Sequence, residues 1–62
     1  MTFRPRTQEE EVVYGALTPM PQALDDVVEV VKLPTSKVSS TLTVLELRGA
    51  AKNLGAGQWI RA

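Results

Sequence analysis

Residues 33–49 constrain the fold more than any other part of the chain, because they contain both the start signal and the stop signal of one helix. Pro34 prevents a helix from continuing from upstream. The hydroxyl group of Thr35 or Ser36 can cap the first turn, and Gly49 can adopt the left-handed conformation that ends a helix. The pattern therefore predicts a helix with two well-defined ends.

The apolar residues of this helix share one face. Val38, Leu42 and Leu45 are spaced by four and three positions, which places them on one side of an α-helix. The polar residues gather toward another face, and they are Ser36, Lys37, Ser40 and Thr43. We therefore expect one face to pack in a core and the other to face outward.

A first helix is predicted near the N-terminus. Thr7 and Glu10 have the spacing of a capping box, and the helix is predicted over residues 8–17. Its apolar stripe consists of Val12, Val13, Ala16 and Leu17. Two prolines in residues 18–21 exclude a helix there, because proline lacks a backbone donor and forces the residue before it to be extended. This segment is expected to be a linker of fixed shape.

A second, shorter helix is predicted over residues 26–31, with the carboxylate of Asp25 as its cap. Three valines have the spacing of an inward face, namely Val27, Val28 and Val31. Val30 lies on a flank where a small domain normally has a polar residue. The core alone does not account for it.

A β-hairpin is predicted at the end of the chain. Residues 50–54 and 58–62 are two short runs on either side of the tip Gly55-Ala56-Gly57, whose glycines can supply positive φ angles. Three helices followed by this hairpin predict a mainly α fold, a winged helix-turn-helix with a two-stranded β-hairpin wing. We expect one core formed by Leu17, Val27, Val38, Leu42, Leu45 and Trp59.

The domain boundaries and the cell compartment follow from composition. Residues 1–6 have no periodicity and are expected to be a disordered arm or the end of a linker, and residues 7–62 one domain. The chain has no Cys, which favours an intracellular, cytoplasmic setting. No apolar run has the length of a signal peptide or a membrane span, so no membrane partner is expected.

The inventory of reactive side chains argues against an enzyme. The chain has no His and no Cys, and so it lacks an ordinary general base and a strong nucleophile near neutral pH. Asp25 and Asp26 form the only tight carboxylate pair. Adjacent acids at a helix start usually serve as a cap and a partner of the helix dipole, so we expect no catalytic residue, no metal and no cofactor.

Charge is distributed unevenly along a chain whose net charge is zero. Residues 7–31 carry −6 and no cation, whereas residues 32–62 carry +4. The side chains expected to meet DNA are Ser36, Lys37, Ser40, Thr43, Arg48 and Lys52. Near its start the third helix offers hydroxyl groups and one Lys outward, but no Arg, Asn or Gln to read bases. Contact with DNA should therefore be weak and independent of sequence, unless this face is only a solvated surface.

The acidic half suggests a protein interface instead. Asp26, Glu29 and Val30 would place a small apolar anchor inside a polar rim. A second copy of the chain or another protein is the expected partner of such a surface. The alternative is that the acids only solvate the outer helix faces.

These motifs together resemble the C-terminal winged-helix domain of the DNA-processing protein DprA, also called Smf. The resemblance rests on an apolar helix, a proline linker, an apolar-acid motif, a helix ending in Leu-Glu-Leu-Arg-Gly, and a short glycine wing that closes with an aromatic and a basic residue. These motifs lie in residues 12–17, 19–21, 24–27, 42–50 and 55–61. Two positions depart from the family pattern: Lys32-Leu33 stands where Gly-Leu is usual, and Val30 replaces a polar residue.

The resemblance implies an accessory module of a larger protein. In that family a preceding Rossmann-like domain binds single-stranded DNA and helps to load the recombinase in natural transformation. It implies no catalytic or DNA-binding residue for this chain. Two alternatives remain, the DNA-binding domain of a transcriptional regulator and a dimerisation or recombinase-docking module without DNA binding.

Overall fold

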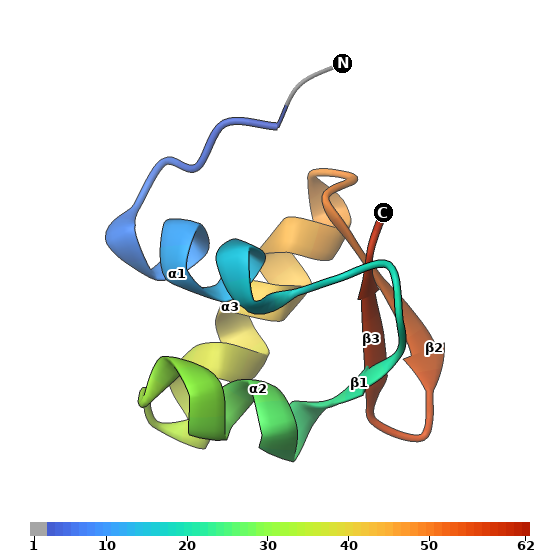
Figure 1. The fold of residues 1–62 in the computed structure, drawn as a ribbon. Coiled ribbons are helices and arrows are strands. Elements are labelled where there is room, and N and C mark those ends of the chain that lie inside the picture. The colour runs from blue at the N-terminus through green and yellow to red at the C-terminus, as the bar shows by residue number, and fades with distance from the viewer. Residues whose placement is uncertain (1–2) are drawn as a thin grey trace.

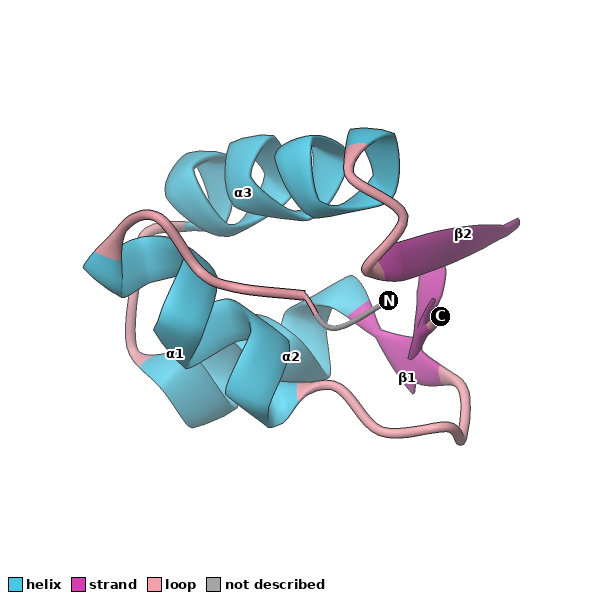
Figure 2. Cartoon of the chain, turned by 90° about the horizontal axis from the view of Figure 1, so that it is seen from above, coloured by secondary structure: helices cyan, strands magenta, loops and turns pink. Residues whose placement is uncertain are grey.

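A computed structural model of the chain describes residues 3–62. Its elements, in order, are helix α1 (Gln8–Ala16), strand β1 (Gln22–Ala23), helix α2 (Leu24–Val31), helix α3 (Thr35–Leu47), strand β2 (Ala51–Gly55) and strand β3 (Gln58–Arg61). The three helices contact one another, and the sheet closes one end of the helical layer (Figures 1 and 2). Over residues 3–62, no helix is both long enough and apolar enough to span a membrane.

Helix α1 begins at the predicted cap. The Thr7 hydroxyl oxygen accepts a hydrogen bond from the backbone N–H of Glu10 at 3.1 Å. In a capping box the Glu10 carboxylate would bond to the N–H of Thr7, but here it accepts from the N–H of Arg6 at 3.1 Å. The helix ends at Ala16, one residue before the predicted end, because Leu17 is extended.

Helix α3 shows which of its predicted end signals act. Its N-cap is Pro34, without a side-chain hydrogen bond, so the expected cap by the hydroxyl of Thr35 or Ser36 is wrong. At the other end Gly49 has a φ angle of 78°, as predicted. The N–H groups of Gly49 and Ala50 donate to the carbonyls of Glu46 and Leu45, at 3.0 and 2.8 Å. This pair of bonds is a Schellman motif.

The start of α2 differs from the prediction. The helix begins at Leu24, two residues earlier than expected, and its N-cap is Ala23, not Asp25. Strand β1 pairs with β3, and the N–H of Leu24 donates to the Gly57 carbonyl at 2.9 Å. The wing therefore holds the backbone where α2 begins, and no side chain caps this helix. Asp25 instead lies exposed in the first turn of α2.

The wing has three strands, not the two predicted. Their order is β1-β3-β2, and both pairings are antiparallel. The pairing of β2 with β3 shifts register between Asn53 and Gly55, and the turn between these strands has positive φ at Gly55, Ala56 and Gly57. Because β1 has only two residues, it is too short to show the alternating pattern by which a strand is recognised in a sequence.

The predicted core is confirmed. All six residues expected to form it are buried, and Val13, Ala50 and Ala51 complete it. Val12, which shares the predicted stripe of α1, is 38% exposed. Trp59 is 7% exposed. Because Trp59 lies on β3, the wing contributes to the core.

Candidate nucleic-acid and protein interfaces

The outward face of α3 is formed mainly by hydroxyl groups. Ser36, Ser40 and Thr43 are exposed on it, and the Thr43 hydroxyl donates to the Ser39 carbonyl at 3.0 Å. Leu47, at the end of the helix, is 83% exposed. This face brings the predicted hydroxyl residues together, but it places no cation at its centre.

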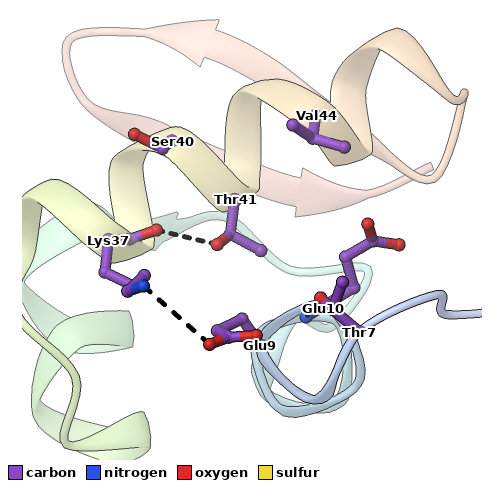
Figure 3. Close-up of a pocket in the computed structure, with 7 residues that line it drawn as sticks. All are labelled: Thr7, Glu9, Glu10, Lys37, Ser40, Thr41 and Val44. Atoms are coloured by element: carbon purple, nitrogen blue, oxygen red, sulfur yellow. Dashed lines mark hydrogen bonds and ion pairs between the residues drawn. The ribbon is translucent and has the colours of Figure 1, made fainter.

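Lys37 lies on the flank of α3 that faces α1. Its ammonium group is 3.9 Å from the Glu9 carboxylate, and both side chains are about half exposed, at 54% and 40%. The two residues line a groove of about 260 Å³ between the start of α1 and α3 (Figure 3). An ion pair this exposed contributes little stability, so Lys37 remains able to exchange Glu9 for a phosphate.

Lys52 lies on β2, opposite Ile60 in the register with β3, and it is exposed. It follows the C-terminal end of α3, whereas Lys37 lies in the first turn. The helical rise from Lys37 to Leu47 alone is about 15 Å. The two lysines therefore lie toward opposite ends of α3 and cannot hold the same phosphate.

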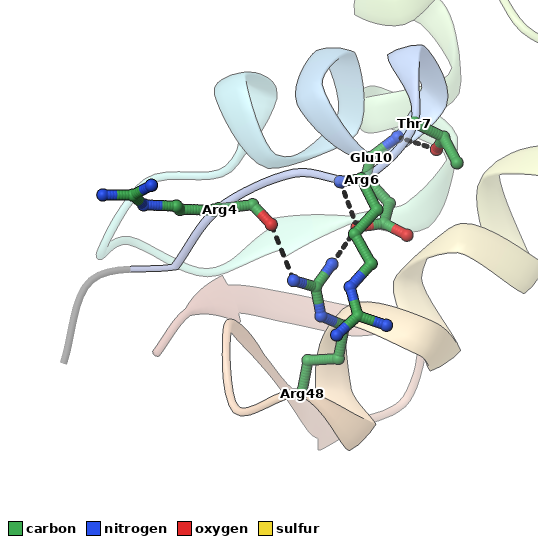
Figure 4. Close-up of polar contacts among 5 residues, drawn as sticks. All are labelled: Arg4, Arg6, Thr7, Glu10 and Arg48. Atoms are coloured by element: carbon green, nitrogen blue, oxygen red, sulfur yellow. Dashed lines mark hydrogen bonds and ion pairs between the residues drawn. The ribbon is translucent and has the colours of Figure 1, made fainter.

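Arg48 occupies an intramolecular site. Its guanidinium donates hydrogen bonds to the Glu10 carboxylate and, at 2.6 Å, to the Arg4 carbonyl (Figure 4). The same group stacks on the Phe3 ring, 4.5 Å from its centre. The side chain is 23% exposed. Arg48 therefore fastens residues 3–6, here called the N-terminal strap, to α1 and α3, and it is less free than Lys37 or Lys52 to contact DNA directly.

A continuous stack extends from Arg48 to the last strand. The ring of Phe3 lies 4.6 Å from that of Tyr14, and the Arg61 guanidinium covers Tyr14 at 4.4 Å. Arg61 also donates to the Tyr14 carbonyl at 3.0 Å. Each cation–aromatic contact of this kind is worth about 0.5–2 kcal/mol. Residues 1–2 of the predicted disordered arm lie outside the described residues, whereas residues 3–6 contact the domain.

Sequence reasoning did not find this stack. Its members come from the strap, α1, the end of α3 and β3, and no periodic spacing links them. The only signal in the sequence is that aromatic and basic residues lie close together at both ends of the chain, as Phe3-Arg4 and Trp59-Ile60-Arg61.

The three predicted docking residues all lie on α2. Asp26 and Glu29 are exposed, and Val30 is 65% exposed. Val27, on the inner face of the same helix, is completely buried. The helix thus has a clear inner face and an outer face that combines carboxylates with one apolar side chain.

Three mutually packed helices, with a hairpin in a small antiparallel sheet at one end, define a winged-helix domain, a class that is generally non-catalytic. The DprA winged helix domain family matches residues 2–57 of the 62-residue chain, and the chain belongs to this family. The resemblance noted from the sequence is therefore confirmed. Comparisons with curated proteins and with solved structures found no match.

Proposed function

We propose that this domain is a non-enzymatic, cytoplasmic accessory module of a DprA-like DNA-processing protein. In this proposal it follows a Rossmann-like domain that handles single-stranded DNA and loads a recombinase during natural transformation. Membership of the DprA winged helix domain family supports the assignment to a DprA-like protein. The module itself makes weak DNA contacts that do not depend on base sequence.

The observation that carries this proposal is the composition of the α3 face. Ser36, Ser40 and Thr43 are exposed there, with cations only at the two ends of the helix. Hydroxyl groups and lysines contact phosphates, whereas specific readout normally needs Arg, Asn or Gln at base edges. A transcriptional regulator would need such residues, so this face favours the accessory module over that alternative.

Lys37→Ala and Lys52→Ala are each expected to weaken DNA binding by about twofold or less and to lower its salt dependence slightly, because each removes at most one peripheral phosphate contact. Chemical-shift titration with oligonucleotides of different sequences measures both the affinity and the surface involved. Glu9→Gln serves as a control in the opposite direction, because it frees Lys37 and should strengthen binding. A strong preference for one base sequence would contradict the proposal.

Protein docking by α2 is a second candidate function, and the exposure of Val30 favours it. The outer face of α2 carries Asp25, Asp26 and Glu29 around this valine. These carboxylates repel phosphates. A recombinase, or a second copy of the chain, could therefore contact this face while DNA lies elsewhere.

Val30→Lys is expected to change the free energy of unfolding by less than about 0.5 kcal/mol, as for an ordinary surface substitution. It should weaken self-association or recombinase binding, because it places a charge at the apolar centre of the interface. Sedimentation measures self-association, and a pull-down with purified recombinase measures recombinase binding. Leu54→Lys, at a position that is 45% exposed on the wing, is the matched control. Equal effects of the two substitutions, or unfolding by Val30→Lys, would contradict docking through Val30.

A further inference from the structure

All four arginines of the chain gather in one region. They are joined through the stack and through Glu10: the carboxylate of Glu10 accepts from Arg48 and from the backbone of Arg6, and Arg61 closes the far end of the stack. We call this set the arginine cluster; its members are Arg4, Arg6, Arg48 and Arg61. No lysine belongs to it.

The charge of this region differs from that of the whole chain. The four arginines and Glu10 together carry a net charge of +3, and the remaining side chains of the chain carry −3. Of the four guanidinium groups, that of Arg48 contacts the Glu10 carboxylate. Glu10 is buried, with its side chain 9% exposed. The positive groups are nearer to solvent than the negative one, and the exterior of the cluster is therefore cationic.

Two of the four arginines are available for a ligand. Arg4 and Arg6 are exposed, and within residues 3–62 neither guanidinium takes part in a hydrogen bond or an ion pair. Figure 4 shows the Arg4 side chain extending away from Glu10 and Arg48. Arg48 and Arg61, by contrast, are held by cation–aromatic contacts and hydrogen bonds. Both contribute their charge, and Arg48 keeps the strap in place.

We propose that the arginine cluster binds the phosphodiester backbone of a nucleic acid, with Arg4 and Arg6 as the contacting residues. This inference rests on the proposed function, and it moves the main DNA contact from α3 to the strap. Guanidinium groups bind phosphate oxygens in pairs of parallel hydrogen bonds. The faces of Phe3 and Tyr14 that lie in the stack are already covered, so the contact is with phosphates and not with stacked bases.

The test compares two double variants that lose the same charge. The probe is a fluorescein-labelled oligo-dT of about 15 nucleotides. Arg4→Gln/Arg6→Gln is expected to reduce affinity for it by about tenfold or more near 0.1 M salt. The slope of log affinity against log salt concentration should become shallower by about 1.4. Lys37→Gln/Lys52→Gln should lose clearly less affinity. All four substituted side chains are exposed. Both double variants should therefore melt within a few degrees of the unmodified chain, which thermal unfolding checks.

Four outcomes would overturn the inference. In the first, the arginine double variant binds oligo-dT as tightly as the unmodified chain does. This result would leave DNA contact through α3 standing. The second is an equal loss in the two double variants, since this would show a response to net charge alone. The third is equal binding of oligo-dT and poly-glutamate, which would indicate a site for acidic peptides. If the unmodified chain does not bind oligo-dT, the DNA contact of the proposed function fails as well.

Discussion

Leu42→Ala is expected to lower the free energy of unfolding by about 2–5 kcal/mol, because it removes three carbons from a side chain with no solvent exposure. Leu42 belongs to the single core cluster, together with Leu17 on α1, Val27 on α2 and Trp59 on β3. A cavity at this position therefore reduces packing against every layer of the domain. In a chain of this size the loss approaches the whole stability.

Urea unfolding of the two proteins measures this effect. Leu47→Ala is the matched control, because it is the same substitution in the same helix at a side chain that is 83% exposed. It should change the free energy of unfolding by less than about 0.5 kcal/mol. A nearly neutral Leu42→Ala would show that the core is assembled differently from the structure described here.

Glu10→Ala is expected to destabilise the chain by about 1–3 kcal/mol, because it removes a buried acceptor from the partly buried Arg48 guanidinium and from the Arg6 N–H. Glu10 is the acceptor for the Arg48 guanidinium and for the backbone N–H of Arg6. The Arg48 side chain is 23% exposed, and water can replace part of the lost interaction. The expected cost is therefore smaller than the roughly 3–5 kcal/mol typical of breaking a fully buried ion pair.

Glu11→Ala is the control for this substitution, because Glu11 lies in the same first turn of α1 and is exposed. It shares the favourable position near the positive end of the helix dipole, but among residues 3–62 it has no hydrogen-bond or ion-pair partner across the domain. A double-mutant cycle with Arg48→Ala isolates the contact, and we expect a coupling free energy of about 0.5–3 kcal/mol. If the two substitutions are additive, the ion pair does not hold the strap on the domain.

Features that depend on neighbouring residues could be predicted. The end of α3 is one example, since the Schellman motif uses only Leu45, Glu46, Gly49 and Ala50. The Thr7 cap of α1 is another, because its hydrogen bond to Glu10 spans three residues. The apolar spacing of Val38, Leu42 and Leu45 likewise predicted which side of α3 is buried.

Features that depend on residues far apart in the chain could not be predicted from the sequence. Strand β1 exists because Gln22 and Ala23 pair with Trp59 and Gln58, and that pairing also shifts the start of α2 to Leu24. Nothing within the two residues of β1 distinguishes them from the end of a proline linker.

The sequence by itself determined the order of the helices, the core face of α3 and the position of the wing, because hydrophobic periodicity, caps and glycine turns act over a few residues. It also identified the family, since the motifs of the resemblance are short runs. Only the tertiary structure decided which charges are free. Arg48 looked available for DNA, but its partners are Glu10, 38 positions earlier, and Arg4, 44 positions earlier. The use of a charged side chain depends on which groups folding brings beside it, and for Arg48 those groups lie at the other end of the chain.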